Sequence, residues 1–92
     1  MHLDDETAPE TRITPALLLR VYQRALSVGQ EVEPGVHQVD ELRVTADPDG
    51  YAISVSDGVI TARLMFHNKM AIEGANRRRL AVFRQRLERL DD

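Results

Sequence analysis

The chain has 92 residues, of which 42% are hydrophobic and 29% are charged, and its formal net charge is −3 at pH 7. This size and composition predict one globular domain with a modest core. No apolar run is long enough for a transmembrane helix, and the absence of cysteine excludes disulfides and thiolate metal sites.

Residues 1–12 are rich in Asp, Glu, Thr and Pro and have no apolar periodicity. Such a segment buries too little apolar surface to fold, so we expect a disordered acidic tail here and a single α+β domain at residues 13–92. The acidic start lacks the basic and apolar regions of a secretory signal, which favours a cytoplasmic location.

The first helix is predicted to begin at Thr14-Pro15. A threonine side chain caps a helix, and proline suits the first helical position, where no backbone N–H is needed. A broad apolar arc follows, formed by Leu17, Leu18, Val21, Tyr22, Ala25 and Val28. Gly29 is expected to end the helix as a C′ residue.

Residues 30–35 are expected to form an acidic loop, because Glu33-Pro34-Gly35 cannot continue a helix. Residues 36–39 either begin the first strand or precede it. We place the first strand itself at residues 41–46.

Two turns predict a three-stranded meander over residues 42–69. Asp57-Gly58 between alternating runs is typical of a type I′ hairpin loop, which pairs Val55 with Ile60. A loop at residues 47–50 pairs Val44 with Ile53. This register collects one apolar face, made of Leu42, Val44, Ala46, Tyr51, Ile53, Val55, Ile60, Ala62, Leu64 and Phe66. The other face is polar and carries Arg43, Thr45, Ala52, Ser54, Ser56, Val59, Thr61, Arg63, Met65 and His67.

The second helix is predicted from about Asn76, although its first residue could lie anywhere within 69–76. A narrow apolar stripe recurs at helical spacing, formed by Leu80, Phe83, Leu87 and Leu90. The run Arg77-Arg78-Arg79 would oppose the positive end of the helix dipole. Either the helix begins earlier, capped by Asn68, or these charges serve something outside it.

The predicted fold is therefore α+β, in the order helix, three-stranded antiparallel meander, helix. Both helices most simply cover the single apolar face of the sheet. The polar face then stays open.

Three segments resemble the recurring pieces of a small bacterial family catalogued only as a domain of unknown function. They are Asp49-Gly50-Tyr51, Ser56-Asp57-Gly58 and Phe66-His67-Asn68-Lys69. The resemblance covers about residues 16–90 and includes the leucine-rich first helix. It implies no activity, substrate or cofactor, so no functional residue carries over from the family.

The strand register also predicts a candidate binding cluster, because it brings the first turn beside the end of the third strand. The cluster comprises Asp47, Asp49, His67, Asn68 and Lys69. Two carboxylates near a histidine can bind a polar ligand or raise the histidine pKa. The plainer alternative is that Asp47 caps its own turn and Lys69 makes a surface ion pair.

The sequence contains no recognised metal-ligand spacing, and the predicted register sets no histidine beside Ser54 or Ser56. We therefore predict neither a metal, nor a cofactor, nor an enzymatic activity. The leading hypothesis is a non-enzymatic module that binds or regulates an unknown protein partner.

The alternative hypothesis is RNA binding, because helix, three strands, helix is also the element order of double-stranded-RNA-binding domains. Arg77, Arg78 and Arg79 would then contact phosphates. Against this, residues 1–57 hold eleven acids and four arginines while residues 58–92 hold eight bases and four acids, so the two halves can balance each other. The chain could be a monomer, or a homodimer joined through the exposed first or third strand. No membrane contact is expected.

Overall fold

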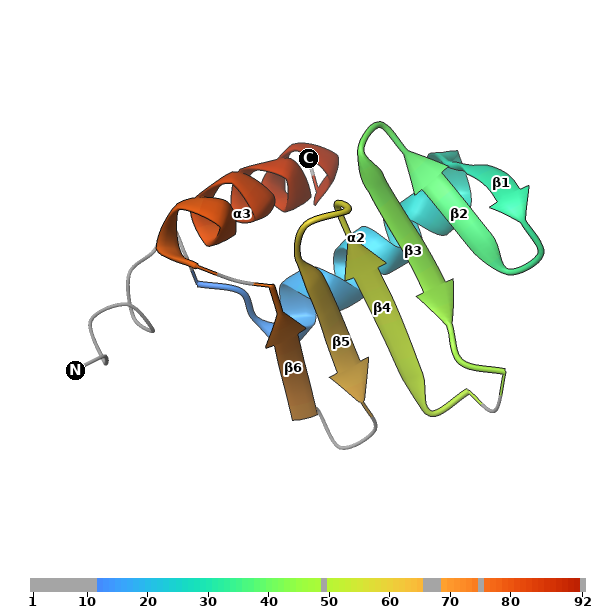
Figure 1. Cartoon of the computed structure of the whole chain (residues 1–92). Helices are drawn as coiled ribbons and strands as arrows, with labels where there is room; N and C mark the ends of the chain where they lie inside the picture. The colour runs from blue at the N-terminus through green and yellow to red at the C-terminus, as the bar shows by residue number, and fades with distance from the viewer. Residues whose placement is uncertain (1–11, 49, 66–68, 75, 92) are drawn as a thin grey trace.

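The computed structural model describes residues 12–48, 50–65, 69–74 and 76–91. Within them, one helix precedes and one helix follows the strands of a single sheet (Figure 1). The helices are α2 (Pro15–Val28) and α3 (Arg77–Asp91). The strands are β1 (Gln30–Glu33), β2 (Val36–Val39), β3 (Leu42–Ala46), β4 (Ala52–Ser56), β5 (Thr61–Met65) and β6 (Lys69–Glu73). They form a six-stranded meander in chain order, each strand antiparallel to the next.

The α+β class is therefore correct, but the prediction of a three-stranded meander is wrong, because the described chain forms six strands. The expected loop at residues 30–35 is β1 and its turn, where Gly35 has a φ of +81°. All four residues of β1 are exposed, so this strand has no apolar alternation to reveal it. The predicted edges of the meander, residues 41–46 and the strand after Val59, are interior strands.

Both predicted hairpin registers are shifted by two residues. Val55 lies opposite Ala62 rather than Ile60, and Val44 lies opposite Val55 rather than Ile53. Each loop begins one residue later than expected. In the second loop, Asp57 donates its N–H to the Ile60 carbonyl at 3.2 Å, and in the first, Asp47 donates its N–H to the Ala52 carbonyl at 2.9 Å. An even shift keeps every side chain on its predicted face.

The helix ends follow the predicted capping chemistry with one difference. The Thr14 side chain accepts the Leu17 N–H at 3.1 Å, and Asn76 accepts the Arg79 N–H at 2.9 Å, so α3 begins after Asn76. Gly29 ends α2 with an extended backbone, not a left-handed one. A Cβ on Gly29 would lie 2.5 Å from the Ala25 carbonyl oxygen, so glycine is needed there for a close approach.

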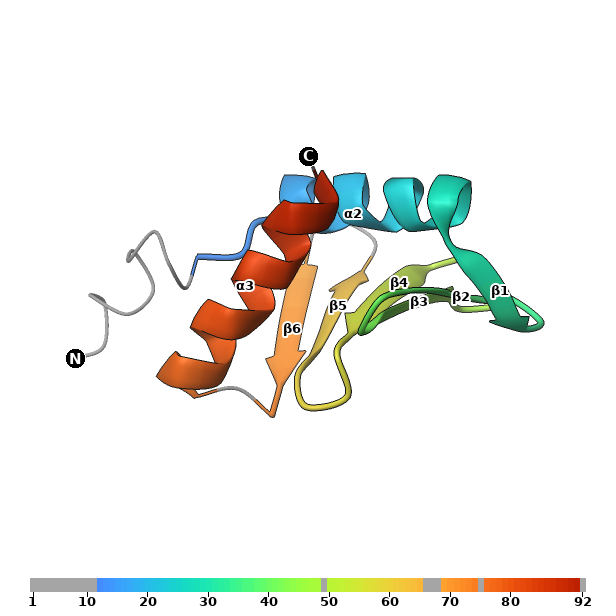
Figure 2. The same cartoon turned by 90° about the horizontal axis from the view of Figure 1, so that it is seen from above.

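One hydrophobic core joins the two helices to a single face of the sheet. Figure 2 shows α2 lying across that face, and α2 also packs against α3. The largest fully buried side chains come from all three parts of the fold: Leu18, Val21, Val44, Val55, Ile60, Phe83 and Leu87. The expectation that both helices cover the apolar face agrees with this shared core.

The predicted apolar face is buried over only part of its length. Tyr51 is 61% exposed, Ala46 is exposed and Ile53 is half-buried. Figure 1 shows why: the hairpin that connects β3 to β4 extends beyond both helices. Two helices cannot cover six strands from end to end.

An ion pair at the surface joins the middle of α2 to the last residue of α3. Arg20 donates to both carboxylate oxygens of Asp91, with the closest N···O distance at 3.0 Å. This hydrogen bonding holds the pKa of Asp91 below its ordinary value. Because both groups lie at the surface, the pair orients α3 more than it stabilises the fold.

Two neighbouring leucines test the orientation of α2. Leu18 is fully buried whereas Leu19 is 44% exposed. Leu18→Ala should lower the free energy of unfolding by about 2–5 kcal/mol, because it empties a core position. Leu19→Ala should change it by less than about 0.5 kcal/mol. Urea unfolding followed by circular dichroism measures both, and equal losses would mean that α2 is rotated about its axis.

Candidate functional site

The structure describes two members of the predicted binding cluster and separates them. Asp47 contacts Arg63, with Oδ2 2.6 Å from Nη2, while Lys69 is exposed at the start of β6. Two strands lie between their positions, which corresponds to about 14 Å at the usual strand spacing. Asp49, His67 and Asn68 lie outside the described residues. The cluster as a whole therefore stays a prediction.

Arg77, Arg78 and Arg79 form the exposed first turn of α3. Two acids of the N-terminal half contact other arginines: Glu41 pairs with Arg86, and Asp47 pairs with Arg63.

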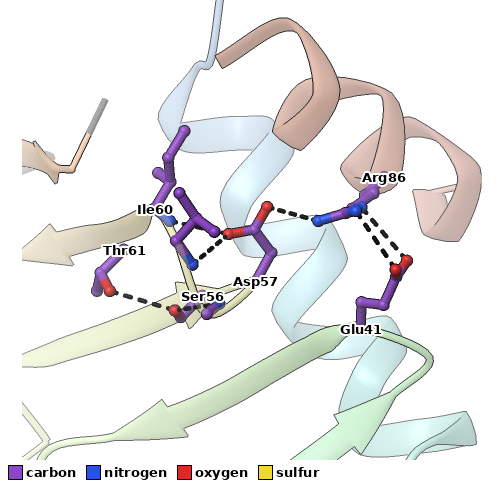
Figure 3. A network of polar contacts seen from close by, with 8 residues as sticks. Glu41, Ser56, Asp57, Ile60, Thr61 and Arg86 are labelled. Atoms are coloured by element: carbon purple, nitrogen blue, oxygen red, sulfur yellow. Dashed lines mark hydrogen bonds and ion pairs between the residues drawn. The ribbon is translucent and has the colours of Figure 1, made fainter. Parts of the chain in front are cut away.

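A polar junction around Arg86 ties α3 to two turns of the sheet (Figure 3). Arg86 Nη1 lies 2.7 Å from Asp57 Oδ2, and its Nε lies 3.3 Å from Glu41 Oε1. The other oxygen of Asp57 accepts the N–H groups of Val59 and Ile60 at 2.9 and 2.8 Å. The Asp57 side chain is only 4% exposed, so this carboxylate is buried with its partners in place.

A small cavity of about 70 Å³ lies beside this junction. It is lined by Val39, Asp40, Glu41, Leu42, Arg86, Arg89 and Leu90. Its volume is far below the roughly 300–1,000 Å³ of sites that enclose a small molecule. Because Glu41 and Arg86 already satisfy each other, the junction is best explained as structural.

A second concavity, which we call the hollow, lies on the sheet face that the helices leave open. It has a volume of about 110 Å³ and is lined by Ser54, Thr61, Arg63, Ala71 and Glu73 from strands β4, β5 and β6. Arg63 stands between Ser54 and Ala71 in the ladder, and Glu73 stands opposite Thr61. The hollow thus offers two hydroxyls, a guanidinium and a carboxylate.

The polar groups of the hollow are held in place by neighbours. Thr61 donates its hydroxyl to Ser56 at 3.2 Å. Arg63 is 46% exposed although it also contacts Asp47, so its guanidinium still meets solvent. An incoming polar group therefore meets a cation that is already positioned.

Sequence reasoning identified three of the five residues that line the hollow. Ser54, Thr61 and Arg63 belong to the predicted polar face, and the alternation of their strands was sufficient to find them. Ala71 and Glu73 were missed because the predicted meander ended at Lys69, whereas residues Lys69–Glu73 form a further strand, β6.

The described residues contain no group of three His, Cys, Asp or Glu side chains that could hold a metal ion. His37 has a buried Nδ1 without a hydrogen-bond partner, and it lies opposite Val44 on the helix-covered face. It is therefore on the other side of the sheet from the hollow. In the described part of the chain, no helix is long and apolar enough to cross a membrane.

The fold defines the chain as a small α+β protein in which two helices cover one face of an antiparallel meander. It belongs to the family described as protein of unknown function (DUF3081), whose model matches residues 13–92. This confirms the resemblance to an uncharacterised family. Neither the curated proteins nor the solved structures contain a significant match to this chain.

The junction makes a prediction about stability. Asp57→Ala should lower the free energy of unfolding by about 2–3 kcal/mol, because Arg86 and two backbone N–H groups lose their acceptor. Asp57→Asn keeps an oxygen for the turn and should cost about 1 kcal/mol. Glu41→Gln is the control and should cost under about 0.5 kcal/mol, since the Glu41 side chain is 61% exposed. Urea unfolding measures the free energy of unfolding of each variant. If Glu41→Gln lowers it as much as Asp57→Ala does, Asp57 is not the residue that stabilises the junction.

Proposed function

We propose that this protein is a non-enzymatic binding module that docks a protein partner on the open face of its sheet. The hollow is the observation that carries the proposal, because it is a polar concavity on the face that neither helix covers. Its walls come from three adjacent strands, which hold its side chains more rigidly than loops would.

The size of the hollow favours a protein partner over a small molecule. About 110 Å³ is well below the roughly 300–1,000 Å³ of small-molecule sites. It suits a single side chain inserted from a larger surface, which is how protein interfaces use such pockets. The partner we propose is a polypeptide that inserts one polar side chain between Arg63 and Glu73.

The chemistry of the hollow also favours binding over catalysis. A serine or threonine nucleophile needs a base within hydrogen-bond reach. The ladder neighbours of Ser54 are Thr45 and Arg63, neither of which is a base, and the Thr61 hydroxyl donates to Ser56 rather than to Glu73. His37 lies on the opposite face. A cytoplasmic location for this module stays a prediction from the sequence.

Site-specific photo-crosslinking tests the proposal. A photoreactive amino acid at Thr61 should give one discrete adduct in cells, whereas the same residue at Gln23, on the exposed side of α2, should not. Mass spectrometry identifies the adduct, and the purified partner is then titrated against variants. Ser54→Arg, which fills the hollow, should weaken binding by about tenfold or more, and Gln23→Arg should leave it unchanged.

Two outcomes contradict the proposal. Equal adducts from both positions, or none from Thr61, would remove the open face as a docking surface. A partner that binds Ser54→Arg as tightly as the unaltered protein would remove the hollow. Thermal melting of each variant establishes that it is folded before binding is measured.

RNA binding is the second candidate, favoured by one observation: three consecutive arginines, Arg77, Arg78 and Arg79, are exposed on the first turn of α3. The original reason for this candidate is gone, since a six-stranded sheet does not have the element order of a double-stranded-RNA-binding domain. The net charge of −3 would repel a polyanion at long range.

Retention on duplex RNA separates the two candidates. We expect neither the unaltered protein nor a variant with Arg77, Arg78 and Arg79 all changed to Gln to be retained at physiological salt. If RNA is the ligand, the unaltered protein binds, and the variant flattens the salt dependence by about two to three phosphate equivalents. That result would replace the protein partner by RNA.

A further inference from the structure

The meander has two edge strands, β1 and β6, and they differ in how they meet solvent (Figure 1). An edge strand presents unpaired backbone groups that can pair with another chain. Proteins block such pairing with bulges, prolines and like charges. The two edges can therefore be compared for these devices.

Strand β1 is blocked in all three ways. Its pairing with β2 is interrupted by an irregularity between Glu31 and Glu33, and Pro34 follows directly. Two carboxylates within four residues would also repel a second acidic strand. The β1 edge therefore disfavours pairing with a strand of another chain.

Strand β6 carries neither bulge nor proline. It pairs with β5 without interruption from Lys69 opposite Met65 to Glu73 opposite Thr61. Its outer charges are of opposite sign, one at each end of the strand. In Figure 1, α3 lies beyond the C-terminal end of the β6 arrow.

The sequence of β6, Lys-Met-Ala-Ile-Glu, is complementary to itself when read in the opposite direction. We infer that β6 pairs antiparallel with the β6 of a second copy of this chain, about a two-fold axis at Ala71. Lys69 then lies opposite Glu73 of the second copy, and this pair occurs twice. Met70 lies opposite Ile72 of the second copy, also twice.

The faces of the sheet select this register. Met70 and Ile72 are partly buried against the core, whereas Lys69 and Glu73 are exposed on the open face. A one-residue slip sets Lys69 against Ile72 and joins the apolar face of one copy to the polar face of the other. Centring the axis on Met70 or Ile72 instead loses both charge pairs. Only the register at Ala71 satisfies charge and burial together.

The pairing also continues both layers of the fold. A two-fold axis perpendicular to the sheet turns the helices of both copies to the same side, and the two open faces to the other. Each α3 lies past its own Glu73, so the two α3 helices sit at opposite ends of the shared edge. Lys69 of the second copy comes to the rim of the hollow, beside Glu73.

Charge reversal with sedimentation equilibrium tests this pairing in the full chain. The unaltered protein should show a concentration-dependent mass above the 10.4 kDa of one chain. Lys69→Glu and Glu73→Lys should each weaken the dimer by at least about tenfold, because two attractive pairs become two repulsive ones. An equimolar mixture of the two variants should dimerise again, because every pair in the mixed dimer is attractive.

The matched control is Glu33→Lys on the other edge, which should leave dimerisation unchanged. A protein that stays at the mass of one chain up to its solubility limit overturns the inference. So does a dimer that both single variants leave intact, or a loss that mixing does not reverse. Failure of the partner test on Ser54→Arg would remove the proposed function but would leave this pairing standing.

Discussion

The ion pair between Asp57 and Arg86 is the interaction on which the position of α3 depends. Only Phe83 and Leu87 of α3 are fully buried, so apolar packing alone holds this arginine-rich helix weakly. Asp57 closes the β4–β5 turn with one oxygen and binds α3 with the other. A single carboxylate therefore fixes a turn and a helix at once. The Ser56-Asp57-Gly58 segment that marks the family resemblance is thus explained by structure rather than by a ligand.

A second arginine of α3, Arg84, also connects the helix to another part of the chain. Arg84 contacts the backbone carbonyl of Arg12 and the carboxylate of Glu88, and Asp91 receives Arg20 from α2. The bidentate geometry of the guanidinium suits such contacts better than an ammonium would. Arg84 and Arg86, in the middle of α3, are therefore part of the fold.

The helices and the faces of the central strands could be predicted from the sequence, because local chemistry determines them. Thr14-Pro15 specifies a helix start without help from the rest of the chain. The predicted faces of β3, β4 and β5 are correct although their register was not, because an even shift does not exchange the two faces of a sheet. The β4–β5 register was wrong because Asp57 is bonded across the turn: its N–H donates to the Ile60 carbonyl, and its side chain accepts the N–H groups of Val59 and Ile60.

The edge strands β1 and β6 were not predicted because they carry little apolar signal, and residues 36–39, which form β2, were left open. The sequence Gln-Glu-Val-Glu resembles a solvated loop, and only its pairing with β2 makes it a strand. The same limit hid part of the hollow, since Ala71 and Glu73 become neighbours of Arg63 and Thr61 only once β6 joins the sheet. The predicted cluster around His67 depended on the shape of that same connection. A site assembled by strand pairing is visible only after the pairing is known.

The hollow and the β6 edge share Ala71 and Glu73, so the proposed binding of a partner and the proposed pairing of two copies would be linked. The sign of the linkage follows from charge. A partner that inserts a cation toward Glu73 competes with Lys69 of the second copy, and each process then weakens the other. A partner that inserts a carboxylate toward Arg63 meets no such competitor, and the added Lys69 at the rim strengthens its binding. The dependence of dimer mass on partner concentration therefore reports the charge of the inserted side chain.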